Sequence, residues 1–324
     1  MHNNKATYRL LCEQEPSISL FSQPWWLDAV IGPDGWDVAL IEKGGLVVAT
    51  MPYLRQRRAG FLISTQPWLT LSLGPWLRPS TAKLPRRLGQ QKELLQGLIA
   101  QLPRFDHFEQ KWHYDQTNWL PFRWSGFRQT TDYSYVITDL SDTRAIWDGF
   151  QENIRKEIRK ALNRSQLCVR DDRPLDDMLR LHRLTFERQH RATPCPERVI
   201  HSLDAACAAR GQRRLFIAED VQGRQHAAVY MVWDSNSAYY LLGGGDPALR
   251  NSGAASLCMW EAIRHAATVT RRFDFCGSTA EPIEQFVRAF GGLQCPYFSV
   301  SKTPSKLLAG YRFLTTMLPA SQTA

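Results

Sequence analysis

Apolar residues in the middle of the chain recur first at helical spacing and then at strand spacing. From residue 146 to residue 162 an apolar side chain stands at every fourth position, and this stripe predicts one long amphipathic helix that Asp142 caps. Shorter apolar runs at 213–219, 225–233 and 238–242 then predict a meander of three strands. The middle of the chain therefore changes from helix to sheet.

The same patterns continue on both sides of this region. The first half has strand patterns at 36–42, 46–53, 61–64, 105–110 and 129–138, and helix patterns after Ser22 and at 85–102. The second half adds strand patterns at 167–170, 272–275 and 297–301, and helix patterns at 175–189, 197–209, 252–267, 282–290 and 304–318. This order predicts an α/β (α+β) fold with mixed, mainly antiparallel sheets flanked by helices. We expect two tandem domains, residues 1–140 and 141–324.

Positive charge is concentrated in the second half. Residues 1–150 carry 16 Lys and Arg against 14 Asp and Glu, whereas residues 151–324 carry 24 against 17. The two differences, +2 and +7, sum to the net charge of +9. An arginine-rich surface suits phosphate or carboxylate groups. The excess indicates either a solvated basic face or an anionic partner such as a nucleotide-like cofactor, a tRNA or a nucleotide sugar.

The cysteines and the apolar runs bear on location. Seven cysteines stand at scattered spacings without a Cys-x-x-Cys pair, which is typical of a reducing compartment. The chain has neither a signal-peptide core after Met1 nor the roughly 18 apolar residues that span a bilayer. We expect a cytoplasmic protein with no transmembrane segment. The basic helix pattern at 304–318 is expected to pack on the sheet, with peripheral membrane contact as the alternative.

One short stretch carries the strongest chemical signal. It comprises Arg250, Asn251, Ser252, Gly253, Ala254 and Ala255, at the start of the helix predicted from residue 252. Small residues there leave the first backbone N–H groups of the helix uncovered, and the helix dipole adds partial positive charge. Such a helix start binds phosphate groups. The preceding run 243–245 has three glycines but no Gly-x-Gly-x-x-Gly pattern, and we interpret it as a flexible turn.

The order of strand, Arg-x-x-Gly-x-Ala and helix resembles the pyrophosphate loop of the GNAT acyltransferase superfamily. The basic segment 153–161, and the segments 273–278 and 286–292, are similar to the FemABX-like branch, in which two GNAT-like domains stand in tandem. The first half is similar mainly through its Trp25-Trp26 helix and its hairpin. Where that branch usually carries lysine, this chain has Arg288, which keeps the charge but cannot act as a nucleophile.

The resemblance implies transfer of an acyl or aminoacyl group to an amine. The donor would be an acyl-CoA, with acetyl-CoA as the leading candidate, and residues 250–255 would hold it. The first domain would be a degenerate, acceptor-side domain. Aminoacyl-tRNA is the alternative donor, although the chain has no room for the coiled-coil insert that tRNA-dependent members commonly carry. The acceptor would be a small-molecule or cell-envelope-precursor amine, and no DNA partner is expected. A catalytically silent GNAT-like binding module is a third hypothesis.

Four residues are candidates for the chemistry. An amine that attacks a thioester needs donors for the oxyanion and a group that takes its proton. Asp274 and Glu281 are candidate bases, and Arg288 is a candidate for steadying a phosphate or an oxyanion. Tyr297 is a candidate proton donor to the leaving thiolate. Each of the three non-arginine residues also has a structural interpretation, as a turn aspartate, a helix-start carboxylate and a core tyrosine.

Other chemistries have no support in the chain. The spacings of His190, Cys195, His201 and Cys207 match neither a zinc finger nor a helical His-x-x-x-His pair, so no metal is expected. The P-loop pattern Gly-x-x-x-x-Gly-Lys-Ser/Thr and the nucleophile pattern Gly-x-Ser-x-Gly are both absent from the sequence. The tryptophans at 25, 26, 68 and 76 fit either a core or the floor of an acceptor cleft.

Overall fold

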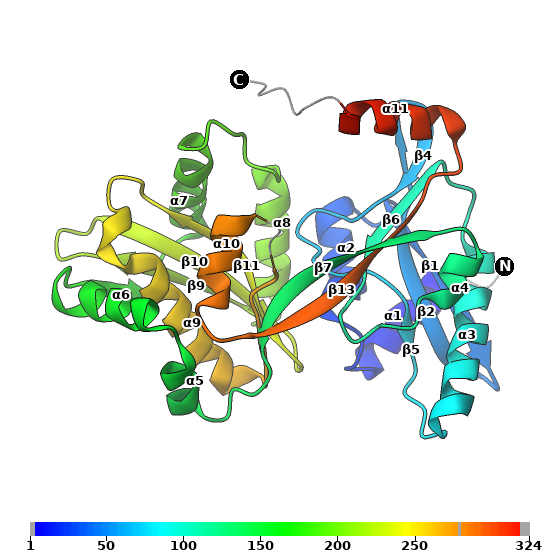
Figure 1. The fold of residues 1–324 in the computed structure, drawn as a ribbon, viewed down its shortest axis with the longest axis horizontal. Helices are drawn as coiled ribbons and strands as arrows, with labels where there is room; N and C mark the ends of the chain where they lie inside the picture. The colour runs from blue at the N-terminus through cyan, green and yellow to red at the C-terminus, as the bar shows by residue number, and fades with distance from the viewer. Residues whose placement is uncertain (1–3, 278–279, 318–324) are drawn as a thin grey trace. The chain divides into compact units, whose positions relative to one another are not determined.

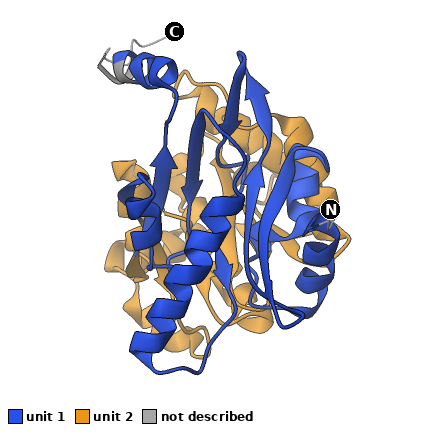
Figure 2. Ribbon diagram, turned by 90° about the vertical axis from the view of Figure 1, so that its right-hand side faces the viewer, with its two compact units in different colours: residues 1–132, 296–323 blue, residues 133–295, 324 orange. Residues whose placement is uncertain are grey.

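The computed structural model describes residues 4–277 and 280–317 (Figure 1). The chain folds into two compact units, which Figure 2 distinguishes by colour: unit 1 comprises residues 1–132 and 296–323, and unit 2 comprises residues 133–295. The strands β7 (Arg128–Ile137) and β13 (Leu293–Lys302) each begin in one unit and end in the other. The sequence prediction has a single boundary after residue 140, whereas the contacts group the last stretch of the chain with unit 1.

Unit 1 contains a small sheet and part of a larger one. The small sheet joins β1 (Trp36–Lys43), β2 (Leu46–Leu54) and β5 (Trp76–Leu77), all antiparallel. The strands β3 (Gln56–Arg58), β4 (Phe61–Ser64) and β6 (His107–Lys111) follow one another in the strand order, and β6 pairs with the end of β13. The helical segments are η1 (Leu20–Ser22), α1 (Asn4–Gln14), α2 (Pro24–Ile31), α3 (Leu84–Gln101), α4 (Leu120–Trp124) and α11 (Lys306–Met317).

The predicted hairpin of unit 1 is confirmed, and two details of its helices differ from prediction. Trp36 pairs with Leu54, and the turn at Gly44 and Gly45 has positive φ values of 60° and 76°. Ser22 does not cap α2, because it lies in the short helix η1. The helix α1 escaped prediction, since only Tyr8 and Leu11 of its eleven residues are buried and they make no periodic apolar stripe.

Unit 2 is built around six strands in the order β7-β12-β11-β10-β9-β8. The new strands are β8 (Cys168–Arg170), β9 (Arg213–Glu219), β10 (Gln225–Trp233), β11 (Ala238–Gly245) and β12 (Phe273–Asp274). Only the β11–β12 pair is parallel among these described strands. The helical segments are α5 (Thr143–Gly149), α6 (Glu152–Asn163), α7 (Leu175–Glu187), α8 (Glu197–Ala208), η2 (Arg250–Ser252), α9 (Ala254–Val269) and α10 (Glu281–Arg288).

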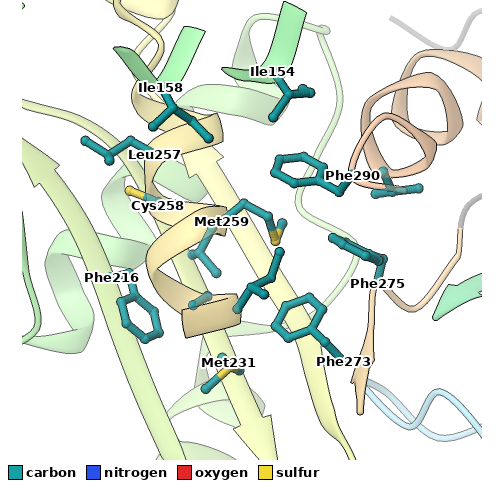
Figure 3. Close-up of a cluster of buried hydrophobic side chains, with 14 of the residues drawn as sticks. Ile154, Ile158, Phe216, Met231, Leu257, Cys258, Met259, Phe273, Phe275 and Phe290 are labelled. Carbon is teal, nitrogen blue, oxygen red and sulfur yellow. The ribbon is translucent and has the colours of Figure 1, made fainter. Parts of the chain in front are cut away.

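The main core of unit 2 lies between α9 and one face of this sheet. Figure 3 shows Met259 of α9 on the side of Phe273 and Phe275, and Leu257 of α9 beside Ile158 of α6. Each of these side chains is at most 3 % exposed, and full burial of a large apolar side chain contributes about 1.5–3 kcal/mol. This packing fixes the start of α9 relative to the strands β11 and β12.

The long helix predicted after Asp142 is wrong in its continuity. Asp142 does cap a helix, because its Oδ1 accepts from the Arg144 and Ala145 N–H groups at 2.9 and 3.0 Å. That helix, α5, ends at Gly149, and α6 starts after an extended Phe150 whose ring packs 5.1 Å from the ring of Phe290. Tertiary packing of Phe150 therefore interrupts the periodic stripe. The stripe also ends differently, because Leu162 is 50 % exposed.

The glycine run 243–245 is part of β11 and not a flexible turn. A Cβ atom on Gly244 would lie 2.4 Å from the backbone nitrogen of His182 in α7. The strand therefore needs glycine here so that α7 can pack directly on its backbone. Ser278, the last residue of one of the family-like segments, lies outside the described residues.

Candidate functional site

The strands β11 and β12 pair over only two residues and then separate. Ala238 pairs with Phe273 and Tyr239 with Asp274. The chain after Asp274 stays beside β7, with which β12 is already paired, since the Phe275 N–H donates to the Tyr135 carbonyl at 2.9 Å. The edge of β11 from residue 240 onward consequently has no strand partner on the β12 side within the described residues.

A bulge in β11 decides which backbone groups meet this open edge. Tyr230 of β10 is opposite Leu242, but Met231 is opposite Tyr240, so Leu241 is an extra residue in β11. Beyond the bulge, the Gly245 N–H faces away from β10, because it donates to the Thr185 hydroxyl at 3.0 Å. The alternation of a strand places the N–H of Gly243 on the same edge.

The start of α9 follows β11 and the short helix η2 in the chain and has no side-chain cap. The first four N–H groups of a helix have no partner inside it, and here the Leu257 N–H makes the first such bond, to the Gly253 carbonyl at 3.1 Å. The Ser252 hydroxyl oxygen is buried without a hydrogen-bond partner in the described structure. Arg250 is exposed and has no ion pair among the described residues. These residues fit an anionic group such as a phosphate.

Gly253 has a structural role as well. Its φ is 82°, and a Cβ atom would lie 2.2 Å from the Glu157 carbonyl oxygen of α6. The Ser165 hydroxyl also donates to the Ser252 carbonyl at 3.3 Å. The glycine thus lets the C-terminal half of α6 pack against the loop, so its presence alone does not establish phosphate binding.

Asp274 is a buried aspartate whose Oδ1 is already hydrogen-bonded. It is 6 % exposed and accepts from the Cys276 N–H at 2.7 Å and from the Ser134 hydroxyl. Asp274 therefore holds the chain on β7 at the point where it leaves β11. This matches the structural interpretation made from the sequence, and the carboxylate also lies at the base of the open edge.

The other three predicted catalytic residues do not belong to β11 or β12. Two of them lie in α10, and the third lies in β13. Glu281 is exposed at the start of α10 and accepts from Gln285 at 3.2 Å. Arg288 pairs with Glu284 at 2.9 Å, and Tyr135 donates to the same Glu284 oxygen, so the pKa of Glu284 is lowered chiefly by that tyrosine bond. Tyr297 belongs to the part of β13 that lies in unit 1, so the structure does not group it with the three others.

Two side chains at the open edge escaped prediction. The Tyr240 hydroxyl occupies the space above Gly243, where a Cβ atom would lie 1.8 Å from it, and burial raises its pKa to about 12. Burial also raises the pKa of the Cys276 thiol well above its ordinary value, and the backbone N–H of Tyr240 acts in the opposite direction. Cys276 has a left-handed φ of 62°, which is uncommon for a residue with a side chain. No sequence pattern marks either residue.

The basic face of α6 is largely engaged within unit 2. Lys156 and Lys160 form ion pairs with glutamates of the same helix at 2.9 and 2.6 Å. Arg155 donates to the Asp148 carbonyl at 2.7 Å, and Arg159 lies 5.8 Å from the centroid of a Trp147 ring. This face is therefore less available to an external polyanion than its sequence indicates.

Residues 4–277 and 280–317 have neither a candidate metal cluster nor a membrane-spanning helix. They contain no group of three or more His, Cys, Asp and Glu side chains placed to hold a metal ion. None of their helices is both long and apolar enough to cross a bilayer. The helix α11 leaves Leu307, Tyr311 and Leu314 more than 60 % exposed.

The comparisons with known proteins add a family and a fold. Residues 149–283 match the model of the acetyltransferase (GNAT) domain family. This region contains both the parted strands and the start of α9. No curated protein sequence matches the chain significantly.

Three solved structures resemble nearly the whole chain. A FemX crystal structure has a TM-score of 0.67 at 13 % identity, covering 96 % of this chain and 98 % of its own. The C-terminal domain of a putative lysylphosphatidylglycerol synthetase from Agrobacterium fabrum has a TM-score of 0.55 at 13 % identity, with coverages of 96 % and 95 %. A tandem GNAT protein from the clavulanic acid biosynthesis pathway has a TM-score of 0.51 at 11 % identity, with coverages of 92 % and 94 %. At these identities the likeness concerns the fold.

Proposed function

Because residues 149–283 form a GNAT acetyltransferase domain in a chain with the fold of FemX, we propose that the protein is an N-acyltransferase. It would move an acyl group from an acyl-CoA to an amine by direct attack, and acetyl is the leading candidate for that group. The observation that carries this proposal is the separation of β11 from β12, together with the uncapped start of α9, the next α-helix in the chain after β11. An acyl-CoA needs two binding features. A strand edge would hydrogen-bond its amide-bearing arm, and a helix start would bind its phosphates.

The donor would be held by unit 2. Arg250 and the N–H groups of 253–255 would bind the diphosphate, with the buried Ser252 hydroxyl as a further partner. The edge of β11 from Tyr240 to Gly243 would hydrogen-bond the arm that leads to the thioester, since the Gly245 N–H already donates to the Thr185 hydroxyl. In this proposal the acyl carbon would lie near the base of the open edge, beside Tyr240 and Cys276.

The reaction forms a C–N bond and breaks the C–S bond of the thioester. The carbonyl oxygen becomes an oxyanion during attack and needs a positioned donor. We propose the Gly243 N–H for this role, since the bulge turns it towards the open edge. The Tyr240 phenol would hydrogen-bond the leaving thiolate, because a pKa of about 12 keeps it protonated at neutral pH. Tyr297 is the other candidate for that role.

The proton of the amine needs an acceptor. Asp274 and Glu281 remain the candidate bases, and Arg288 remains a candidate for binding a phosphate or the oxyanion. The hydrogen bonds of Asp274 with Ser134 and Cys276 favour a positioning role for it. Water or the substrate could carry the proton instead, and the acceptor would be a small-molecule or cell-envelope-precursor amine.

Calorimetric titration of the full chain with CoA and acetyl-CoA tests the donor. We expect saturable binding that weakens about fivefold in Arg250→Ala, since an exposed ion pair is worth up to about 1 kcal/mol. Arg198→Ala is the matched control, because Arg198 is exposed on α8 and has no ion pair in the described structure. Absence of CoA binding, or an equal loss in the two variants, would contradict the acyl-CoA proposal.

Aminoacyl-tRNA is the second candidate donor, and the +7 charge of the second half and the FemX-like fold favour it. The intramolecular pairs on α6 speak against a large tRNA interface there. Filter binding of aminoacyl-tRNA across a salt series separates the two donors. Tight binding that falls steeply with salt, together with no binding of CoA, would favour tRNA.

Two further proposals concern activity and location. A catalytically silent module would bind CoA but release no free thiol in the presence of any amine, and detectable acyl transfer would dismiss it.

Peripheral membrane contact would use the exposed apolar residues of α11, with Lys306 beside them. Cosedimentation with vesicles of anionic phospholipid tests it, and Leu307→Asp should reduce the bound fraction if the helix is the contact.

A further inference from the structure

Unit 1 contains a cavity of about 300 Å³ that the acyl-transfer proposal does not use. Three segments line it: the end of β2 with the β3–β4 hairpin, and the segment 102–108 that connects α3 to β6. All of these segments belong to unit 1. The volume lies at the lower end of the range of small-molecule sites.

The rim of this cavity is positively charged. Arg55, Arg57 and Arg104 line it. Arg55 shares its charge with Asp37, at 3.4 Å. Arg57 and Arg104 have no acidic partner among residues 4–277 and 280–317. Two exposed arginines without an acidic partner therefore line the same small cavity, where an anion would be stabilised.

The walls of the cavity are apolar and partly fixed. Leu102 and Phe105 are partly buried, and Leu62 is exposed. The ring of Phe105 is held by Phe108 and Phe127, with centroids 5.5 and 6.1 Å apart. An apolar ligand body would cover these surfaces and gain free energy in proportion to the area that it removes from water.

One residue that lines the cavity has a buried polar atom without a partner in the described structure. Ser64 is 5 % exposed and lines the cavity, in register with Phe108 of β6. Its hydroxyl oxygen has no hydrogen-bond partner in the described structure. Buried polar groups are normally hydrogen-bonded, so an orphan of this kind calls for a partner that the chain does not supply.

We propose that this cavity binds an amphipathic anion, a carboxylate or phosphate joined to an apolar body. Arg57 and Arg104 bind the charged head, the Ser64 hydroxyl supplies a further hydrogen bond to its oxygens, and Leu102 and Phe105 cover the apolar body. This site goes beyond the acyl-transfer proposal, because it lies wholly in unit 1 and needs none of the donor-binding residues. It stands or falls independently of CoA binding.

Calorimetric titration of the full chain with decanoate and with decyl phosphate tests the site. We expect at least one to bind saturably, whereas decanol and decyltrimethylammonium bind at least tenfold more weakly. The two probes distinguish a carboxylate from a phosphate head, and inorganic phosphate alone is expected to bind too weakly to detect. Equal binding of decanol, or no binding of either anion at millimolar concentration, would overturn the proposal.

Variants locate the binding site. The double variant Arg57→Ala/Arg104→Ala should weaken binding about tenfold, as expected for two partly screened contacts. Arg86→Ala, which removes an exposed charge from α3 of the same unit, should leave binding unchanged. Ser64→Ala should weaken binding severalfold without lowering the urea midpoint, because its hydroxyl has no partner to lose. Binding that is unaffected by both the double variant and Ser64→Ala would place the anions elsewhere and refute this site.

Discussion

The candidate donor site of unit 2 and the cavity of unit 1 are built from different parts of the chain. The donor site consists mainly of backbone: the open edge of β11 and the N–H groups that begin α9. The unit 1 cavity consists of side chains, with arginines at its rim and a serine inside. The first depends on where the backbone is held, and the second depends on which side chains are present.

This difference predicts how each site responds to substitution. A backbone site should tolerate changes of its own side chains but fail when a neighbour displaces the chain. A side-chain site should lose affinity with each polar side chain while the fold stays intact. The predictions below follow this contrast, from the largest expected effect to the smallest.

Gly253→Val should have the largest effect. A β-branched residue at φ 82° is strained, and its Cβ would overlap the Glu157 carbonyl oxygen. We expect a loss of at least about 2 kcal/mol in the free energy of unfolding, measured in urea, together with loss of CoA binding.

Gly89→Ala is the control for this substitution. Gly89 lies in α3 with nothing within 4 Å of an added Cβ and without a positive φ. Alanine there should stabilise the protein by about 0.5–1 kcal/mol. If both glycine variants behaved alike, the packing of α6 against the loop would not hold the start of α9, and the backbone account of the donor site would fail.

Asp274→Asn should have the next largest effect. The carboxylate accepts two hydrogen bonds, and the amide keeps at most part of this pattern in a buried position. We expect a loss of about 1–3 kcal/mol in urea, and Ser134→Ala should lose a similar amount. The pH profile of acyl transfer distinguishes the roles. If Asp274 only positions the chain, the acidic limb of the pH profile persists in Asp274→Asn. If Asp274 is the catalytic base, that limb disappears in the variant.

The sequence predicts those features that are local in the chain. The strands 213–219 and 225–233 have the predicted bounds, and residues 250–255 follow a strand and include the start of a helix, as their pattern indicates. Both follow from apolar alternation and from small residues at consecutive positions.

Features that depend on distant residues could not be predicted in this way. The helix break at Phe150 depends on the ring of Phe290, and the glycine at 244 depends on α7. The unit 1 cavity joins Ser64 to Arg104, forty residues apart in number, through the pairing of β4 with β6. No period or motif connects such residues, because tertiary packing alone brings them together.

Each site contains one buried phenol, and these give a matched pH test. Burial raises the pKa of both Tyr240 and Tyr53 from 10.0 to about 12. Around and above pH 10 the unfolded chain loses these protons while the folded protein keeps them. The free energy of unfolding is therefore highest, as far as these two phenols contribute, below pH 10, and it falls as the pH rises towards 12. Tyr240→Phe and Tyr53→Phe should each lose less stability than the wild type between pH 8 and pH 11 in urea titrations.

The comparison between the two phenols sharpens the contrast. Equal behaviour of the two variants would show that both sites exclude water to a similar extent. A wild-type-like pH response in Tyr53→Phe alone would indicate that Tyr53 is hydrated and titrates near its ordinary pKa. The cavity would then offer a weaker apolar environment than its lining indicates.

Ser165→Ala should have the smallest effect and tests the backbone account most finely. The Ser165 hydroxyl donates to the Ser252 carbonyl at 3.3 Å, at the last residue before Gly253. One partly buried hydrogen bond of this kind contributes about 0.5–1.5 kcal/mol, so the urea midpoint should fall only slightly. CoA affinity should fall about twofold to fivefold, because the N–H groups that follow are then held less firmly, although Ser165 itself needs to touch no ligand. Ser202→Ala, which removes an exposed serine of α8, should change neither quantity. Unchanged CoA affinity in Ser165→Ala would mean that α6 does not position the loop, and that the side chain of Arg250 carries the binding.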